Sequence, residues 1–377
     1  MDDSLLLLVA VVAVALFFDF TNGFHDAANA IATGISTRAL HPRFAIGMAA
    51  VLNFAGAFIS VKVAATVAKG IVNPDAITLR VVLAGLIGAI TWNLITWYLG
   101  LPSSSSHALI GGTMGSAVAA TGFDVVQWHG IAHKVLIPSL AAPFFGMIGA
   151  ALFMTIILWI IRRRSPGLMN RIFRRLQLFS SGFLAFTHGT NDAQKTMGII
   201  TLALIASGRL AGGDDFHVPV WVIVCAAGAI AAGTYAGGWR IIRTLGQRIA
   251  KLEPPQGFSA EAATSLTLYF TAHYGFPVST THSISGSVLG AGATKRFSAV
   301  RWGVAGNIVT AWIMTIPCAA FVGAAMHGVT RIPGGAIIVF LIGVAVAVVA
   351  FTARARASRH LQVPPPAQPS QPQPVSS

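Results

Sequence analysis

Long apolar segments dominate this chain and restrict it to a small set of folds. A helix needs about 20 mostly apolar residues to cross roughly 30 Å of hydrocarbon, whereas a barrel strand needs only about ten residues of alternating pattern. Charged residues make up only 10% of the 377 residues, against about 25% in soluble domains. The sequence therefore predicts an all-α polytopic membrane protein. The apolar runs are 4–18, 44–61, 81–99, 135–161, 197–207, 218–236, 302–326 and 336–351.

Positive charge is concentrated in short segments between the apolar runs. The formal net charge is +14, and most of the 25 Lys and Arg residues fall into five clusters. Cytoplasmic loops of membrane proteins carry an excess of Lys and Arg, so the pattern indicates membrane orientation rather than binding to nucleic acid. The clusters expected on the cytoplasmic side are Arg38 and Arg43; Arg162, Arg163, Arg164, Arg171, Arg174 and Arg175; Arg240, Arg243, Arg248 and Lys251; Lys295, Arg296 and Arg301; and Arg354, Arg356 and Arg359.

A weak internal repeat divides the chain into two halves. Matched segments that recur in the same order are the sequence signature of a repeated structural unit. Phe, Thr, Gly and Asp coincide in the first pair of segments, which puts Asp26 opposite Asp192. The pairs are FTNGFHDAANAIATG (20–34) with FTHGTNDAQKTMGII (186–200), LPSSSSHALIGG (101–112) with FPVSTTHSISGS (276–287), and WHGIAHKVLIPSLAAPFFGMIGAA (128–151) with WGVAGNIVTAWIMTIPCAAFVGAA (302–325).

The basic clusters predict that the two halves cross the membrane in opposite senses. If the clusters are cytoplasmic, the chain starts outside, and segment 80–121 leaves from and returns to the outer side. Segment 259–295 lies between two basic clusters and enters from the inside. We interpret both as re-entrant helical hairpins with hydroxyl-rich tips, so the fold is two inverted-topology repeats, each with transmembrane helices and one hairpin. If the hairpin arms cross fully instead, the hydroxyls move from the midplane to the surface.

The same pattern sets the expected domain boundaries. The first apolar run lacks the cationic start of a signal peptide, so we interpret it as a retained first helix. The C-terminal segment is rich in Pro, Gln and Ser, a composition typical of disorder. The expected units are a first inverted repeat (1–161), a basic cytoplasmic linker (162–177), a second inverted repeat (178–330), an extra C-terminal transmembrane helix (331–353) and a disordered cytoplasmic tail (354–377).

The proline–hydroxyl segments are candidate anion-binding sites. A proline at each tip stops the first arm and fits the first turn of the second. Backbone N–H groups at the start of the second arm lack intrahelical partners, and the helix dipole there favours an anion. Hydroxyls in the same turn can donate to oxyanion oxygens, although such residues can also simply cap helices or bond back to carbonyls. The substrate-binding candidates are Ser104, Ser105, Ser106, Ser279, Thr280 and Thr281.

Asp26 and Asp192 form a second candidate site, for a coupling cation. Each lies in apolar surroundings, where a charged carboxylate costs several kcal/mol unless it is paired. Local unwinding near the neighbouring glycines would combine carbonyl and carboxylate oxygens into a site for a hard cation. Asn29 shares a helix face with Asp26, while Lys195 takes that place in the second half and can neutralise Asp192 or contact the anion. The alternative is a structural Asp–Lys or Asp–His pair; Asp19 is a candidate partner behind the site.

Three histidines lie close to these motifs. His25 adjoins the first aspartate, and His107 and His282 occupy matching positions after the hydroxyls. Imidazoles can donate hydrogen bonds to oxygen or carry protons, so we assign them supporting roles. The alternative is that they are hydrogen-bonded packing residues.

At these residues the sequence resembles the inorganic phosphate transporter (PiT) family, of the bacterial low-affinity phosphate permease type. The family's signature is a duplicated Gly-x-Asn-Asp-type motif with a duplicated Pro-x-Ser-x-Thr-His-type motif. NGFHDAANA and HGTNDAQK match the first type, and LPSSSSH and FPVSTTH match the second, within about residues 5–330. The resemblance implies an inverted-repeat fold, often dimeric, that moves phosphate together with Na⁺ or H⁺.

The resemblance also implies roles for the motif residues. The Asp motifs, which include Asn29 and Asn191, would help to bind coupling cations, and the hydroxyl motifs would bind phosphate. His25 stands where sodium-coupled and eukaryotic-type signatures have Asn, while Asn191 is retained in the second half. This departure resembles bacterial proton-coupled members that carry metal–phosphate complexes. The family also has sulfate-transporting members, so a sulfate or other oxyanion permease is the alternative.

We therefore expect a secondary active transporter, not an enzyme, that imports inorganic phosphate by symport with H⁺ or Na⁺. The phosphate would be carried either as the free anion or as a metal–phosphate complex. The expected partners are phosphate and membrane lipid, with no cofactor, in a homodimer in the bacterial cytoplasmic membrane; a protein-bound metal stays unknown. A serine hydrolase using Ser106, His107 and an aspartate is a competing class, but adjacent helical residues do not face each other. A passive anion channel is another. The phosphate-binding pattern Gly-x-x-x-x-Gly-Lys-[Ser/Thr] is absent, which favours an ion gradient as the energy source.

Overall fold

Helices form the framework of the protein. The computed structural model describes residues 3–213 and 216–359, and within those ranges it contains isolated β-bridges but no β-strand. The α-helices are α1 (Asp3–Ser36), α2 (Pro42–Gly56), α3 (Lys62–Lys69), α4 (Leu79–Leu99), α5 (Ser105–Thr121), α6 (Trp128–Gly130), α7 (Ile137–Ile161), α8 (Pro166–Ala206), α9 (Val220–Ala236), α10 (Trp239–Arg243), α11 (Pro254–His273), α12 (Thr280–Ala293), α13 (Trp302–Thr330) and α14 (Gly335–Arg359). Short 3-10 or π segments are η1 (Pro74–Ala76), η2 (Phe123–Val125), η3 (Ile131–Leu136), η5 (Thr244–Arg248) and η6 (Phe297–Ala299).

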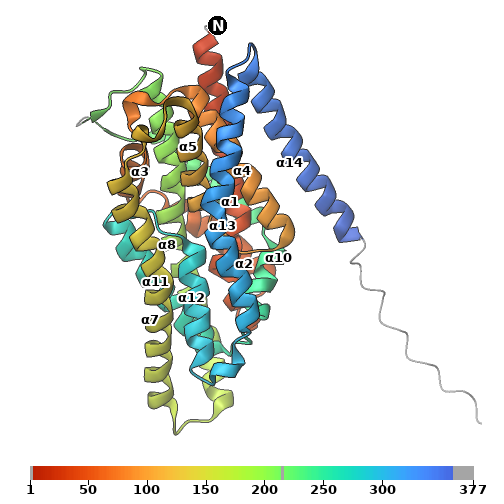
Figure 1. Cartoon of the computed structure of the whole chain (residues 1–377). Coiled ribbons are helices and arrows are strands. Elements are labelled where there is room, and N and C mark those ends of the chain that lie inside the picture. Colours follow the sequence, from red (N-terminus) through yellow and green to blue (C-terminus); the bar gives the residue numbers. More distant parts are fainter. Residues whose placement is uncertain (1–2, 214–215, 360–377) are drawn as a thin grey trace, which may run out of the picture.

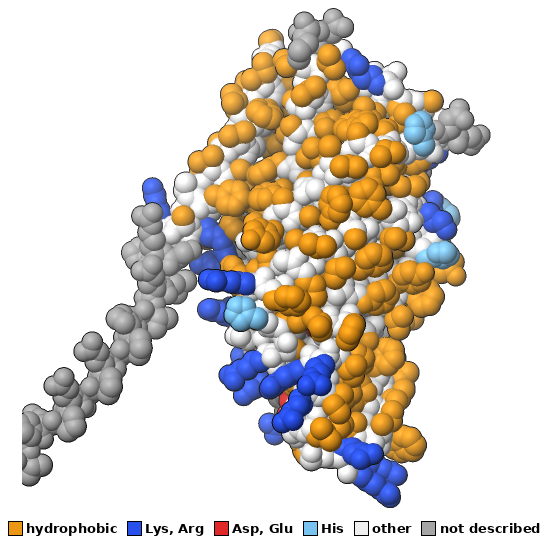
Figure 2. All heavy atoms as spheres, turned by 180° about the vertical axis from the view of Figure 1, so that it is seen from behind, with side chains coloured by type: hydrophobic (Ala, Val, Ile, Leu, Met, Phe, Trp, Pro, Cys, Tyr) orange, Lys and Arg blue, Asp and Glu red, His pale blue; other side chains and the backbone are white. Residues whose placement is uncertain are grey.

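Five helical segments in the described ranges are long and apolar enough to cross a membrane. They are Ser4–Ser36, Leu79–Leu99, Trp128–Ile161, Trp302–Thr330 and Gly335–Arg356. A sixth results if Val220–Ala236 and Trp239–Arg248, which meet at 63°, count as one broken span. Hydrophobic side chains cover most of the face shown in Figure 2, and Lys and Arg gather toward its lower end. The prediction of an all-α, polytopic membrane protein is confirmed.

The helix order of the first half recurs in the second. The elements α1, α2–α3, α4–α5 and α7 are followed in the same order by α8, α9–α10, α11–α12 and α13. Helices of the first half pack against helices of the second half. In these contacts α5 lies against α13, α7 against α12, α1 against α9 and α2 against α8. Figure 1 places α5 toward the end where α1 begins and α12 toward the opposite end. This arrangement fits two related halves, and their inverted orientation in a membrane stays a prediction.

Both expected hairpins are helix–turn–helix units whose turns contain a left-handed glycine. Gly100 ends α4 with φ 72°, and Gly275 follows α11 with φ 76°, a region in which residues with a Cβ are strained. Pro102 and Pro277 lie two residues further on and cannot continue the first arm. The expectation that these prolines occupy the first turn of the second arm is wrong, because α5 and α12 begin only after a serine N-cap.

Glycines behind the tips let the helices approach closely. A Cβ atom added to Gly115 of α5 would lie 2.1 Å from the carbonyl oxygen of Ala320 in α13. In the second half, a Cβ atom on Gly290 of α12 would lie 2.0 Å from the carbonyl oxygen of Met147 in α7. Small residues are typical of such close helix contacts in membranes, and here they hold each hairpin against a long helix of the other half.

The helix boundaries differ from two of the expected domain limits. α8 begins at Pro166, so most of the expected linker (162–177) is helical, since proline is well suited to the first turn of a helix. The extra C-terminal helix, expected at 331–353, is α14 and extends to Arg359, so it includes the first residues assigned to the tail (354–377). From residue 360 on, that tail lies outside the described residues.

Candidate substrate and ion site

The two hairpin tips meet the middle parts of α1 and α8 inside the protein. Ser105 and Ser106 begin α5, and Thr280 and Thr281 begin α12. All four residues are at most 2% exposed. The hydroxyls therefore lie in the interior of the protein, and their depth in a membrane stays a prediction.

Asp26 receives hydrogen bonds from both hairpins. Ser105 of α5 donates to its Oδ2 at 2.8 Å, and Thr281 of α12 donates to its Oδ1 at 3.3 Å. His25 Nδ1 lies 2.6 Å from the same Oδ1, and Asn29 Nδ2 donates to Thr281 Oγ1 at 2.9 Å. The structure thus brings together the predicted aspartate, amide and hydroxyl groups of the first cation motif.

His25 links Asp26 to the turn of the first hairpin. Its Nε2 lies 3.1 Å from Thr96 Oγ1 and 3.4 Å from Ser103 Oγ. Ser103 also donates to Thr96 Oγ1 at 2.8 Å. The imidazole is therefore held between the carboxylate and the hairpin, and movement of that hairpin would change the contacts of His25.

Asp192 forms the centre of a second cluster, in which Lys195 contacts both hairpins. Lys195 Nζ lies 2.5 Å from Asp192 Oδ1 and donates to Ser106 Oγ and, at 3.1 Å, to the carbonyl oxygen of Val278. Thr280 donates to Asp192 Oδ1 at 3.2 Å. Because Lys195 is only 1% exposed, its ammonium group depends on this carboxylate for compensation. The expected Asp–Lys pair is present, and it lies directly against the hydroxyls.

The two carboxylates approach each other closely enough to share a cation. Asp26, His188 and Asp192 each offer one ligand atom, and these atoms lie within 4.8 Å of one another. The Oδ1 atoms of Asn29 and Asn191 have no hydrogen-bond partner in the described part of the chain. Carboxylate and amide oxygens are the ligands that hard cations prefer. The cluster can therefore hold a small cation beside the tip hydroxyls.

Ser104 and Ser279 differ from the other hydroxyl candidates. They are the N-caps of α5 and α12 and accept hydrogen bonds from the backbone N–H of His107 at 3.2 Å and of His282 at 3.3 Å. Such a cap satisfies one of the N–H groups left unpaired at a helix start. These two serines match the capping alternative, while the four hydroxyls that follow them face the charged groups.

His107 and His282 face each other rather than the carboxylates. Their ring centroids lie 4.8 Å apart, and His282 also packs against Trp312 at 4.1 Å. Both line a cleft of about 500 Å³ between α7, α12 and α13. No hydrogen bond joins either ring to Asp26 or Asp192 among the residues described here. This placement matches the packing alternative.

Asp19, the candidate supporting residue, lies on α1 in the interior of the protein. It is fully buried, and neither of its carboxyl oxygens has a hydrogen-bond partner among the described residues. Asn22, three residues further along the helix, accepts a hydrogen bond from Ser105 at 2.6 Å. In the described part of the chain, no hydrogen bond therefore joins Asp19 to the hairpin tip, and its supporting role stays a prediction.

Two residues of the site, Asn22 and His188, are absent from the sequence-based candidates. Asn22 contacts the first tip, and His188 Nε2 lies 3.3 Å from Asp192 Oδ2. They occupy matching positions of the repeat, each four residues before an aspartate. Residues four apart share a helix face, so a polar residue matched at this position in both halves is the signal that could have found them.

Glu261 of α11 is a further buried carboxylate that the sequence-based candidates do not include. Thr33 of α1 donates to its Oε1 at 2.6 Å, and Ser181 and Gln177 of α8 donate to the same oxygen at 2.8 and 3.1 Å. Ser180 donates to Oε2. No Lys or Arg of the described chain lies within ion-pair distance of it. Among the described residues, hydroxyl and amide groups are the donors to this carboxyl group, which connects α1, α8 and α11.

Comparison with known proteins gives one consistent result. A family model described as "Phosphate transporter family" matches residues 22–323. The chain is 49% identical over 339 residues to a probable low-affinity inorganic phosphate transporter of Mycobacterium bovis, covering 89% of this chain and 80% of that protein. Proteins with the same description match from Rhizobium meliloti (50% over 319 residues, 84% and 95% covered) and Bacillus subtilis (44% over 326 residues, 86% and 97% covered).

A solved structure, "The sodium-dependent phosphate transporter", shares the fold with a TM-score of 0.79 and 23% identity, covering 86% of this chain and 99% of that one. The family match includes both aspartate motifs and both hairpin tips. The resemblance expected from the motifs is therefore confirmed: the chain belongs to the phosphate transporter family.

Proposed function

We propose that this protein is a secondary active transporter that imports inorganic phosphate by symport with H⁺ or Na⁺ across a bacterial cytoplasmic membrane. One observation supports the proposal above all others. Hydroxyls from both hairpin tips donate to carboxylates of α1 and α8, so the groups suited to an anion and those suited to a cation are in direct contact. The descriptions of the relatives as phosphate transporters support the choice of substrate.

Direct contact makes the binding of anion and cation interdependent. A hydroxyl has one proton to donate; Thr280 and Thr281 donate theirs to carboxylates, and Ser105 shares its proton between Asp26 and Asn22. When phosphate accepts these hydrogen bonds instead, each carboxylate loses a donor and needs another positive partner. An arriving proton or Na⁺ supplies that partner, so phosphate and the coupling ion bind together.

Electrostatic repulsion acts in the same direction. Two unit charges of the same sign 4 Å apart repel each other by about 4 kcal/mol at an effective dielectric constant of 20. Asp192 is compensated by Lys195, whereas the only ion-pair partner of Asp26 among the described residues is His25, which is charged only when protonated. Asp26 is therefore the carboxylate at which the coupling ion has the larger effect.

We assign phosphate to the starts of α5 and α12. The four residues that begin these helices offer hydroxyls, and their backbone N–H groups lack intrahelical acceptors, which is the usual chemistry of an anion site at a helix start. Lys195, which contacts Ser106, would approach the anion from α8. Ser104 and Ser279 would act indirectly, by fixing where the two helices begin.

The hairpins provide a route for alternating access. All four tip residues are buried, so the conformation described here is closed around the site. The hairpins α4–α5 and α11–α12 lie toward opposite ends of the molecule (Figure 1). Displacement of one hairpin would open the site to one side of the membrane, and displacement of the other would open it to the opposite side.

Uptake of radiolabelled phosphate into proteoliposomes tests the proposal. We expect accumulation above the external concentration under an imposed H⁺ or Na⁺ gradient, and loss of accumulation when the gradient is collapsed. Equilibration without accumulation would instead indicate a passive channel. Sulfate that competes as well as phosphate would favour the broader oxyanion permease. Uptake with and without Mg²⁺ distinguishes free phosphate from a metal–phosphate complex as the transported species.

A further inference from the structure

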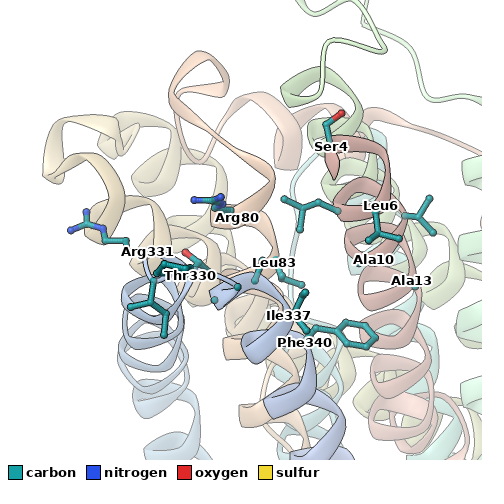
Figure 3. Close-up of a pocket in the computed structure, with 17 residues that line it drawn as sticks. Ser4, Leu6, Ala10, Ala13, Arg80, Leu83, Thr330, Arg331, Ile337 and Phe340 are labelled. Carbon is teal, nitrogen blue, oxygen red and sulfur yellow. The ribbon is translucent and has the colours of Figure 1, made fainter. Parts of the chain in front are cut away.

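A cleft at one end of the molecule lies apart from the transport site and has a mainly apolar lining. Its volume is about 920 Å³, and it lies between the starts of α1, α4 and α14. Figure 3 shows Leu6, Ala10 and Ala13 of α1 on one side of it and Ile337 and Phe340 of α14 on another. The lining consists mostly of such apolar side chains, so the cleft is suited to hydrocarbon rather than to a free ion.

A second apolar cleft continues from the first along α14. Its volume is about 460 Å³. Ala13 and Phe340 line both clefts, so together they form one continuous groove between α1, α4 and α14, which we call the α14 groove. Its lower part is lined by apolar side chains of the same three helices, among them Val14, Ile87, Ile90, Val344 and Phe351.

Basic side chains stand at the upper end of the α14 groove. Figure 3 shows Arg80 above Leu83 and Arg331 beside Thr330, and both arginines are exposed. Arg331 Nη2 donates to the carbonyl oxygen of Ala119 at 2.9 Å. Within the described chain, the Arg80 guanidinium group has neither a hydrogen bond nor an ion pair. Among the described residues, the Arg80 guanidinium group is thus free, and that of Arg331 has unused donors.

His327 is a neighbour of these two arginines. It lies close enough to Arg80 and Arg331 for their charges to act on its ring. The residue is 7% exposed, and its Nδ1 has no hydrogen-bond partner among the described residues. The two arginines therefore carry the positive charge of this rim, and no ion pair with a described carboxylate compensates either of them.

Arg80 and Arg331 are two of the seven Lys and Arg residues that lie outside the five basic clusters. Most of the chain's Lys and Arg residues lie in the clusters that we expect on the cytoplasmic side. Arg80 and Arg331 lie instead toward the end where α1 begins, which the charge pattern assigns to the outer side. Loops on that side of membrane proteins are normally poor in Lys and Arg, and neither arginine forms an ion pair with a carboxylate in the described part of the chain.

We propose that the α14 groove binds one anionic phospholipid, with its phosphate group against Arg80 and Arg331 and its acyl chains along α1, α4 and α14. Guanidinium groups bind phosphate oxygens through charge-assisted, often bidentate hydrogen bonds. Free phosphate could use the rim but not the apolar groove below it. A helix from a second copy of the chain would fill the groove but would leave the rim without an anion.

Native mass spectrometry with phosphatidylglycerol and phosphatidylcholine tests this proposal. We expect the unaltered protein to retain phosphatidylglycerol at least tenfold more often than phosphatidylcholine. The Arg80→Gln/Arg331→Gln protein should lose this preference. Arg209→Gln, which removes an exposed arginine from the loop after α8, should keep it. Unfolding curves in lipid-free detergent will show whether each variant is folded.

A second variant tests the groove separately from the charges. Ala13 lies on the surface and lines both clefts, so Ala13→Trp should fill the groove and abolish retention of either lipid while both arginines stay in place. Three results would overturn the proposal: equal retention of phosphatidylglycerol by all variants, displacement of the lipid by millimolar inorganic phosphate, or conversion of a dimer to a monomer by Ala13→Trp, which would assign the groove to a second copy.

Discussion

Replacing Asp192 by asparagine should destabilise the protein much more than the same change at Asp26. Lys195 Nζ lies 2.5 Å from Asp192 Oδ1, and Lys195 is 1% exposed. At an effective dielectric constant of 20, the attraction between unit charges at that distance is about 7 kcal/mol, and part of it offsets the cost of removing the ammonium group from water. Removing one partner of a buried ion pair typically costs about 3–5 kcal/mol, which is the loss of unfolding free energy that we expect for Asp192→Asn.

A double-mutant cycle measured by unfolding in detergent tests this reasoning. Asp192→Asn/Lys195→Gln should be more stable than Asp192→Asn, because no charge is left buried alone. We expect a coupling energy above about 1 kcal/mol, the range found for residues in one charge network. Asp26→Asn serves as the control, since it leaves no lysine unpaired. Strictly additive losses, or equal losses for the two aspartates, would refute the assignment of Asp192 as the partner of Lys195.

Other substitutions test the hairpin tips, the Glu261 cluster and the orientation. Thr281→Val removes a hydroxyl with little change in shape, and it should weaken phosphate binding by about 1.5–3 kcal/mol, roughly 10- to 150-fold in the concentration dependence of uptake; unchanged affinity would exclude Thr281 from the site. Glu261→Ala leaves donors of α1 and α8 unpaired and should lower the unfolding free energy by about 3 kcal/mol or more, whereas a neutral effect would show that water replaces the carboxyl group. A cysteine at Arg171 should react only with reagents that enter the cytoplasm and one at Ala76 with impermeant reagents from outside; the opposite labelling would reverse the predicted orientation.

The internal repeat made a large part of the site predictable. Residues with corresponding places in the site occur at matched positions of both halves. The match of Asp26 with Asp192 and of the two hydroxyl segments therefore identified the helices that meet in the interior. The contact between Asp26 and Thr281 joins residues 255 positions apart. No local pattern predicts such a contact; it follows only from the expectation that two matched hairpin tips meet between the halves.

Residues that occur in only one half could not be found in this way. Glu261 corresponds to Leu86 by the spacing of the hairpin tips, so the repeat gives no signal for it, and its donors come from α1 and α8. The difference between Ser104, which caps a helix, and Ser105, which contacts Asp26, depends on the residue at which α5 begins. Sequence patterns locate helix ends only to within a residue or two, which is the distance that separates these two roles.

Phosphate accumulation by the Asp26→Asn protein tests the central claim most directly. Asparagine keeps the size of the side chain and removes its charge, and the adjoining group is His25 rather than a lysine. In proteoliposomes with an imposed H⁺ or Na⁺ gradient, we predict that the unaltered protein accumulates phosphate and that Asp26→Asn only equilibrates it, with little change in unfolding free energy. Accumulation by Asp26→Asn to the level of the unaltered protein would contradict the assignment of this carboxylate as the coupling group.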